Sequence, residues 1–191
     1  MTLHHRLFAA SALACSLALA ACGNEAPEPA PQEEADRAYM AAETTPAMAT
    51  AMLRTADGAD AGMVTATQGD DGIKLTISAR GMSAGEHGIH VHTTGECEGP
   101  KFESAGGHWN PMGAKHGLSN PQGQHHGDMP NLVVASDGSG KMDTVLREAQ
   151  LDEMLDADGA ALVVHAKADD QMTDPSGDSG DRVACGVFAR S

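Results

Sequence analysis

The chain has 191 residues, with 12 basic and 27 acidic side chains and a formal net charge of −15 at pH 7. This length suits one domain of ordinary size with short appendages. The acidic balance argues against a nucleic-acid-binding protein, because few cationic side chains are available to replace the counterions of phosphate groups. It also gives no general attraction for an anionic substrate, so chemistry on an anion must depend on a local positive site.

Residues 1–21 have the features of a secretory signal peptide. Arg6 precedes an apolar run that is too short to span a bilayer comfortably. The run ends in Leu19-Ala20-Ala21-Cys22, which resembles the bacterial lipobox, where the cysteine becomes the acylated first residue of the mature chain. Ordinary cleavage that leaves Cys22 unmodified is the alternative. We therefore expect export to the periplasm and a lipid anchor on Cys22. The sequence leaves the choice of membrane open, although the absence of Asp after Cys22 favours the outer membrane by resemblance to known lipoprotein sorting.

Residues 22–48 are rich in Ala, Pro and Glu and contain almost nothing large to bury. Such a composition predicts an extended tether between the anchor and a folded domain. The domain is expected to comprise residues 49–191.

Short runs of alternating polarity, separated by Gly and Asp turns, follow the tether. Residues 63–67 and 73–77 alternate with period two on either side of a Gly-Asp-Asp-Gly turn, which predicts a hairpin. About eight strands in all predict an all-β sandwich or barrel, with a brief helix at 147–155. The further strands expected are 89–92, 131–135, 141–145, 161–165 and 183–189.

Two long segments, residues 93–130 and 166–181, interrupt the pattern of strands. Structureless loops of this length inside a compact domain are usually functional. The chemistry of the protein is therefore expected to lie in these two loops.

Eight of the ten histidines lie between His87 and His165. His90 and His92 stand two apart on a predicted strand, where such residues share a face, so both imidazoles can reach one metal ion. A pair of exposed histidines is common, and this motif alone does not establish a metal site. His87 precedes the strand and is expected to hydrogen-bond to backbone. His165 ends the strand predicted at 161–165.

Four further candidate ligands lie in the first long segment, which is too rich in Gly and Pro to pack a core of its own. Three histidines and one aspartate together supply four ligands, the number that a closed tetrahedral zinc site requires. A bound metal ion would also stabilise such a loop. His126 is an adjacent alternative to His125, but the three-residue separation of His125 and Asp128 suits the turn better. The four candidates are His108, His116, His125 and Asp128.

The chain has four cysteines, of which Cys15 lies in the signal and Cys22 is the proposed lipid site. Cys97 and Cys185 remain in a compartment that permits disulfides, and a single bridge between them is the simplest interpretation. Two free buried thiols are the alternative.

Five motifs together resemble the successive signatures of the copper,zinc superoxide dismutases, in the order of that family and over about residues 49–191. The resemblance implies an eight-stranded Greek-key β-barrel whose two long functional loops hold one copper and one zinc ion per chain. The motifs are Gly88-Ile89-His90-Val91-His92, Gly107-His108-Trp109-Asn110-Pro111, His125-His126-Gly127-Asp128, Leu162–Asp170 and Arg182–Val187.

Every metal-binding position of the family holds the expected residue type. The resemblance implies that copper is bound by His90, His92, His108 and His165. It implies that zinc is bound by His108, His116, His125 and Asp128, so that His108 bridges the two ions as an imidazolate. Asp169 matches a carboxylate that accepts a hydrogen bond from one ligand of each metal, here His90 and His116.

The resemblance also implies that Cys97 and Cys185 form the disulfide of the family and pin the first loop to the last strand beside Arg182. Arg182 then lies at the mouth of the copper channel, where it can hydrogen-bond an anion next to the metal. The alternative is a surface salt bridge from Arg182 to Asp181 or Asp178.

The implied activity is the disproportionation of superoxide to dioxygen and hydrogen peroxide, which would protect the periplasm from oxidative damage. Copper changes oxidation state while zinc is redox-inert, and His108 is expected to act as ligand and proton donor. Relatives carry a lysine in the second loop that attracts the anion, whereas residues 171–178 contain no lysine and two acids. Lys167 either substitutes in part or is solvated. We therefore expect weaker steering than in the fastest relatives.

Two other classes of function remain open. A dismutase-like domain that stores or delivers copper without turnover typically lacks part of the catalytic set, which is complete here. An adhesion or structural sandwich explains the strands and tether but not eight clustered imidazoles. The expected partners are superoxide and, through the lipid alone, a membrane; a monomer and a homodimer are both compatible with the sequence.

Overall fold

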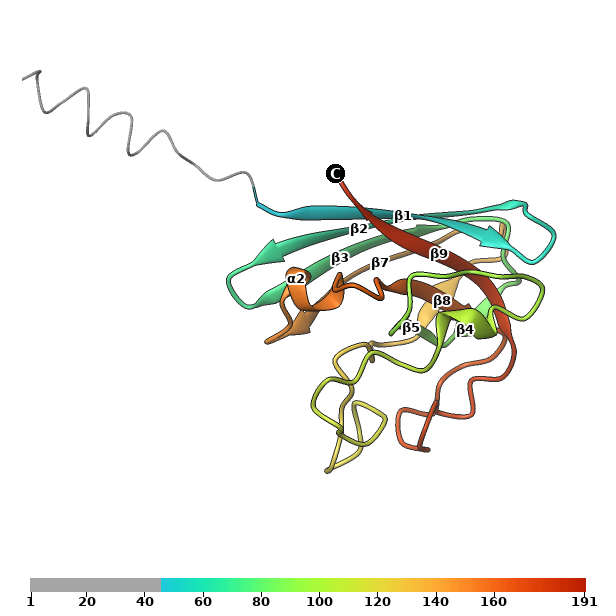
Figure 1. The fold of residues 1–191 in the computed structure, drawn as a ribbon. Helices are drawn as coiled ribbons and strands as arrows, with labels where there is room; N and C mark the ends of the chain where they lie inside the picture. Colours follow the sequence, from blue (N-terminus) through green and yellow to red (C-terminus); the bar gives the residue numbers. More distant parts are fainter. Residues whose placement is uncertain (1–45) are drawn as a thin grey trace, which may run out of the picture. The chain divides into compact units, whose positions relative to one another are not determined.

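Residues 46–191 are described by the computed structural model; the predicted signal peptide, the lipid site at Cys22 and most of the predicted tether lie outside them. Among these residues, no helix is long and apolar enough to cross a membrane. This described part contains nine antiparallel strands and two short helices, whose arrangement is drawn in Figure 1. They are β1 (Met48–Thr55), β2 (Asp60–Gly69), β3 (Gly72–Ala79), β4 (Gly85–His87), β5 (Ile89–His92), η1 (Glu103–Ala105), β6 (Leu132–Val134), β7 (Gly140–Arg147), α2 (Leu151–Met154), β8 (Ala161–His165) and β9 (Arg182–Arg190).

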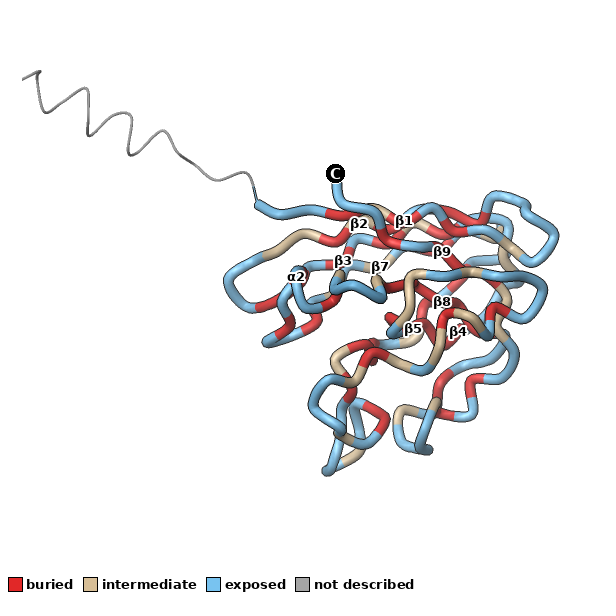
Figure 2. The backbone as a smooth tube through the Cα atoms, viewed as in Figure 1, coloured by how far each residue is buried: buried red, intermediate tan, exposed pale blue. Residues whose placement is uncertain are grey.

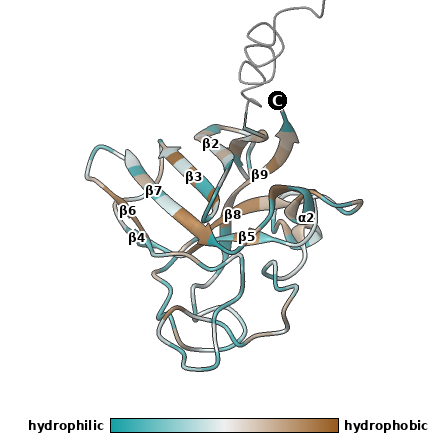
Figure 3. Ribbon diagram, turned by 90° about the vertical axis from the view of Figure 1, so that its left-hand side faces the viewer, coloured by the Kyte–Doolittle hydropathy of each residue, from teal (hydrophilic) through white to brown (hydrophobic). Residues whose placement is uncertain are grey.

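Alternation of apolar and polar side chains places one face of each long strand in the core. In β3, Ile73, Leu75 and Ile77 are buried while Lys74 and Thr76 are exposed, as the period of two requires. Buried and exposed residues alternate along the strands, whereas the two long loops are exposed over much of their length with short buried stretches between (Figure 2). The strands mix hydrophobic and hydrophilic residues along their length, whereas the loops are mainly hydrophilic or neutral (Figure 3).

The predicted hairpin between β2 and β3 is confirmed, with Gly69 opposite Gly72 at its end. Gly72 has a φ of +135°, and a Cβ at this position would lie 2.1 Å from the carbonyl oxygen of Leu146. Only glycine permits this turn where β7 passes close to β3.

The sheet closes on itself through the segment that carries β4 and β5. The strand order is β4-β6-β7-β3-β2-β1-β9-β8-β5, so its two ends are consecutive in sequence and separated by Gly88 alone. Gly88 donates its N–H to Lys167 and accepts from the N–H of His165, and this interrupts the strand. The prediction of an all-β Greek-key barrel is confirmed, and the break at Gly88 accounts for nine strands instead of eight.

Two local features differ from the sequence-based expectation. The helix predicted at residues 147–155 is the single turn α2, because Glu148 adopts a φ of +58° that interrupts a helix. The predicted strands also lack β1, whose inward positions Ala49 and Ala51 are too small to give a clear hydrophobic alternation, and the three-residue strand β4.

The two long loops leave the same end of the barrel and lie side by side (Figure 1). The N–H of Ser119 in the first loop donates to the carbonyl of Gln171 in the second. The loops carry or flank nearly all the candidate ligands, so the fold brings distant histidines to one end of the barrel.

Candidate metal centre

The first group of candidate ligands is built on two paired strands. His90 and His92 lie on β5, which pairs with β8, and His165 ends β8. An isolated bridge between His92 and His108 brings the first loop to the same place. One ligand atom from each of the four histidines lies within 4.8 Å of the others. The structure therefore brings together all four predicted copper ligands.

One ring nitrogen of each histidine in this group is buried and has no hydrogen-bond partner within residues 46–191. Leaving a buried polar atom unpaired is costly, so these atoms point to a ligand. The atoms are His90 Nδ1, His92 Nε2, His108 Nε2 and His165 Nε2.

The opposite nitrogens of the same rings are held in place. His92 Nδ1 donates to the carbonyl of Gly106 at 2.9 Å, and His165 Nδ1 donates to that of Gly180 at 3.2 Å. His90 Nε2 lies 2.7 Å from Asp169 Oδ2. Such bonds fix the tautomer and aim the free lone pair at the centre of the group. Four neutral imidazoles suit copper in both of its common oxidation states, so the residues fit this metal.

Burial keeps these imidazoles neutral. It lowers the pKa of His90 to about 3 against the opposing effect of Asp169, and it lowers the pKa of His165 to about 4. Burial also lowers the pKa of His92 and of His108. Because a metal requires the unprotonated nitrogen, the group is ready to bind one at neutral pH without first losing protons.

A second group of four residues meets around Asp128, which is buried. Asp128 Oδ1 lies 2.9 Å from Nδ1 of His108, 3.1 Å from Nδ1 of His116 and 3.3 Å from Nδ1 of His125. Nδ1 of His108 and Nδ1 of His125 are 3.4 Å apart. Four ligands on a tetrahedron with zinc bonds of the usual length would stand about 3.3 Å from one another. The four predicted zinc ligands therefore fit a closed tetrahedral zinc site.

The carboxylate of Asp128 is held ionised in this position. Its Oδ2 accepts the backbone N–H groups of Gly117 at 2.8 Å and His125 at 3.0 Å. Burial acts to raise the pKa of Asp128, but its contacts with the three histidines outweigh burial and lower it strongly. An ionised carboxylate supplies the negative charge that a divalent cation requires.

His108 belongs to both groups, with Nε2 facing the first and Nδ1 the second. Asp169 joins the groups on the outside, since its two oxygens contact Nε2 of His90 at 2.7 Å and Nε2 of His116 at 3.1 Å. Burial acts to lower the pKa of His116, but Asp128 and Asp169 outweigh it and raise that pKa to about 9. The two groups thus share one imidazole and one supporting carboxylate, as the sequence motifs implied.

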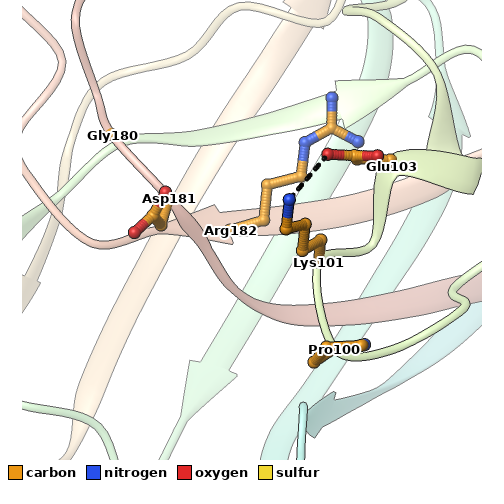
Figure 4. Close-up of a pocket in the computed structure, with 6 residues that line it drawn as sticks. All are labelled: Pro100, Lys101, Glu103, Gly180, Asp181 and Arg182. Atoms are coloured by element: carbon orange, nitrogen blue, oxygen red, sulfur yellow. Dashed lines mark ion pairs between the residues drawn. The ribbon is translucent and has the colours of Figure 1, made fainter.

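Arg182 lies on the wall of a cavity of about 490 Å³ (Figure 4). Its guanidinium donates to the carbonyls of Phe102 at 2.5 Å and Gly106 at 2.6 Å. Within residues 46–191 it forms no ion pair with Asp181 or Asp178, the alternative partners that the sequence allowed. The cavity is lined by Pro100, Lys101, Glu103, Gly180, Asp181 and Arg182.

The carbonyl of Gly106 connects Arg182 to the first group of histidines, because it also accepts from His92 Nδ1. The disulfide between Cys97 and Cys185, whose Cα atoms are 5.7 Å apart, ties this loop to β9. The predicted pairing of the two cysteines is therefore present, and it keeps the acceptors of Arg182 beside that residue.

Lys101 is a feature of the site that the sequence analysis did not identify. It lies in the same cavity as Arg182, with its Nζ 3.7 Å from Glu103 Oε1 (Figure 4). No local motif indicates this neighbour, since Lys101 and Arg182 come together only through the disulfide-linked loop.

The two remaining histidines of the cluster lie outside both groups. His87 Nδ1 donates to the carbonyl of His165 at 2.7 Å, in agreement with its expected backbone role. His126 packs against Trp109 with ring centroids 5.2 Å apart and contributes to neither group. His125, and not its neighbour, therefore faces Asp128.

A β-barrel with two adjacent metal-binding groups that share one imidazole defines the class of this protein as a binuclear metalloprotein. A family model described as copper/zinc superoxide dismutase matches residues 60–188, and the chain belongs to this family, whose members use copper and zinc.

Known relatives cover most of the chain. The superoxide dismutase-like protein YojM of Bacillus subtilis is 37% identical over 191 residues, covering 96% of this chain and 96% of the relative. The superoxide dismutase [Cu-Zn] of Caulobacter vibrioides is 41% identical over 147 residues, covering 73% of this chain and 84% of the relative.

Solved structures share the fold. A double mutant of a superoxide dismutase-like protein from Bacillus subtilis matches with a TM-score of 0.70 at 40% identity, covering 72% of this chain and 95% of that one. The Cu/Zn superoxide dismutase of Brucella abortus matches with a TM-score of 0.64 at 29% identity, covering 74% and 99%.

Proposed function

We propose that this protein is a superoxide dismutase that converts superoxide to dioxygen and hydrogen peroxide in the periplasm. The observation that carries the proposal is the convergence of four buried, unpartnered imidazole nitrogens beside a second group that shares His108. When bound, copper supplies the one-electron oxidation of one superoxide and the one-electron reduction of another, and zinc supplies a fixed positive charge.

The reaction consumes two protons for every two superoxide anions, because the product peroxide leaves as H₂O₂. His108 can supply one of them, since its Nε2 faces the first group and has no competing acceptor within residues 46–191. The opposite nitrogen, Nδ1, is directed at Asp128, 2.9 Å away, so the ring keeps its orientation while Nε2 gains or loses a proton.

Arg182 is the residue that would hold the anion. Its two hydrogen bonds to backbone carbonyls fix the guanidinium on the wall of the cavity, and these neutral acceptors leave its positive charge unpaired. A guanidinium that is oriented but not ion-paired can donate further hydrogen bonds to a small anion.

Attraction of superoxide from a distance would be modest. The second loop carries no lysine at residues 171–178, and the cavity holds Glu103 and Asp181 beside Lys101 and Arg182. The carboxylates offset the two cations, and the chain as a whole has a net charge of −15. Steering therefore depends on local charges that added salt screens only in part.

The direct test measures metal content and superoxide decay on purified protein before and after chelation. We expect copper and zinc in about equal amounts, rapid decay of superoxide with the loaded protein, and loss and recovery of this activity on removal and return of copper. Copper-loaded and zinc-loaded protein that leaves superoxide decay unchanged would rule out the proposed activity.

Storage or delivery of copper is a second candidate, because a relative that matches almost the whole chain is named only as superoxide dismutase-like. The complete set of four imidazoles, each with one ring nitrogen that has no hydrogen-bond partner within residues 46–191, and the oriented Arg182 favour turnover over storage. Rapid transfer of copper from the loaded protein to a chelator, without superoxide decay, would favour delivery instead.

We further propose that the protein is anchored to the outer membrane, on its periplasmic side, through a lipid on Cys22. The lipobox-like sequence Leu19-Ala20-Ala21-Cys22 supports this location. Labelling with a radioactive fatty acid in bacterial cells, followed by membrane fractionation, should find the label on the wild-type protein and not on the Cys22→Ala variant. Unlabelled wild-type protein in the soluble periplasmic fraction would contradict the anchor.

A further inference from the structure

The two long loops contact each other next to the second group of ligands. Ser119 N–H donates to the carbonyl of Gln171 at 3.0 Å, and Asn120 Nδ2 donates to that of Met172 at 3.3 Å. Gly117 has a φ of +105°, and a Cβ there would lie 2.2 Å from the carbonyl oxygen of Gln171. The backbones of the two loops approach so closely here that residue 117 must be glycine. The second loop therefore packs directly against the first loop beside His116.

Asp174 in the second loop contacts two consecutive residues of the first. Its Oδ1 accepts the backbone N–H of His116 at 2.9 Å, and its Oδ2 accepts from Lys115 Nζ at 2.9 Å. The side chains of Asp174 and Lys115 are 39% and 54% exposed, so their ion pair by itself contributes little. The bond to the backbone of His116 is charge-assisted and is the stronger of the two.

His116 is thereby held at three points by three different carboxylates. Its buried ring contacts Asp128 through Nδ1 and Asp169 through Nε2, while Asp174 holds its backbone. We infer that Asp174 is a positioning residue, which orients His116 toward the second group and makes zinc retention depend on the second loop. The inference rests on the proposed zinc site but not on superoxide turnover.

Asp178 provides a matched comparison within the same loop. It is exposed, and within residues 46–191 its side chain makes no hydrogen bond or ion pair. A general effect of negative charge near the metal would involve both acids, whereas positioning involves Asp174 alone.

The experiment measures the rate at which metal-loaded protein releases zinc and copper to an excess of chelator. The variants are Asp174→Ala, Asp174→Asn, Lys115→Met and Asp178→Asn. Asp174→Ala should release zinc about tenfold faster than wild type, because a hydrogen bond to a charged group is lost. Asp174→Asn, which keeps an oxygen acceptor for the N–H of His116, and Lys115→Met should each accelerate release roughly threefold or less.

Copper release provides the readout that separates positioning from loss of folding. Asp174 accepts hydrogen bonds from Lys115 and the backbone of His116 and from none of the four histidines of the first group, so copper should leave the Asp174→Ala variant at the wild-type rate. Cobalt(II) placed in the zinc site should also show an altered visible spectrum in this variant. Asp178→Asn should match wild type in every measurement.

Three results would overturn the inference. They are zinc release at the wild-type rate from Asp174→Ala, equal acceleration of zinc release by Asp174→Ala and Asp178→Asn, and parallel acceleration of zinc and copper release by Asp174→Ala. Wild-type protein that binds no zinc would overturn the proposed metal centre and the inference with it, whereas a lack of dismutase activity in protein that binds zinc would leave the inference standing.

Discussion

His90 and Asp169 form a buried hydrogen bond of 2.7 Å between Nε2 and Oδ2, and both side chains are closed to solvent. The second oxygen of Asp169 reaches Nε2 of His116 at 3.1 Å. Gly177 closes over this link, and a Cβ there would lie 1.8 Å from Asp169 Oδ1, so only glycine leaves room for the carboxylate. One buried carboxylate thus orients a ligand of each metal-binding group.

Replacing Asp169 by Asn should weaken both metal sites. The amide nitrogen cannot accept from a histidine N–H, so one of the two rings loses its orientation. Loss of such a supporting partner typically lowers metal affinity by roughly 10- to 100-fold. Competition with chelators of known affinity measures the effect. Asp170→Asn is the control, because within residues 46–191 that carboxylate accepts hydrogen bonds only from Met172 and Thr173 of its own loop. Equal affinities in Asp169→Asn and wild type would contradict the supporting role.

Much of the barrel and of the ligand set could be predicted because local patterns carry them. The period of two in β2 and β3 predicted a hairpin, and the same period placed His90 and His92 on one face. The number and spacing of polar residues in the first loop also predicted His108, His116, His125 and Asp128 as one set. Placing His108 and His165 with the first pair depended on a family resemblance, since nothing local says that His108 meets His165. The structure brings the two together through long-range strand pairing and loop contacts.

The parts that could not be predicted depend on contacts between distant segments. Lys101 shares a cavity with Arg182 because of the disulfide-linked loop, and Asp174 meets His116 because the two loops pack together. In the sequence, Asp174 was only one of two acids in a loop that lacks the lysine of relatives. In the structure, the carboxylate of Asp174 forms an ion pair with Lys115, so its negative charge is partly neutralised.

The metal-free protein should be most stable near pH 6.5. His90 and His165 have a folded-state pKa of about 3 and about 4, below the unfolded value of 6.5. Between pH 6.5 and about 4 the unfolded state therefore binds more protons, and stability falls as the pH falls. The loss is at most about 1.4 kcal/mol per pH unit for each imidazole.

His116 has the opposite effect, because its folded-state pKa is about 9. Its contribution is complete below pH 6.5 and is lost as the pH rises from 6.5 to about 9. Urea unfolding of metal-free protein from pH 4 to 9 measures both arms, and His116→Gln should remove the alkaline arm. Stability that rises steadily from pH 6.5 to 9 in the wild type would contradict this pKa.

Removal of the metals should destabilise the first loop more than the barrel. The ligands His108, His116, His125 and Asp128 hold a Gly- and Pro-rich segment that has few core contacts of its own, so metal binding supplies much of its order. At a free metal concentration of about a thousand times the dissociation constant, binding adds about 4 kcal/mol to the free energy of unfolding. For a domain of this size, this raises Tm by about 10 °C.

Scanning calorimetry of metal-loaded and chelator-treated protein measures this difference. Zinc should restore most of the lost stability, whereas magnesium, which prefers oxygen ligands, should restore none. Trypsin should cut the metal-free protein at Lys115 earlier than the loaded protein. Equal Tm values with and without metal would show that the loop is ordered by packing alone.

Replacing Arg182 by Ala should slow superoxide decay roughly tenfold and flatten its dependence on ionic strength, because the variant loses the oriented cation of the cavity. Lys101→Ala should give a smaller loss of roughly twofold to threefold, since Lys101 is exposed and lies near Glu103. Pulse radiolysis at several salt concentrations measures both effects. Arg190→Ala is the control, because Arg190 pairs with Asp152 and takes no part in the cavity. Unchanged kinetics and salt response in Arg182→Ala would remove Arg182 from the mechanism. Weak steering would be contradicted by a wild-type rate constant near the diffusional ceiling, roughly 10⁹ M⁻¹s⁻¹, that falls steeply with added salt.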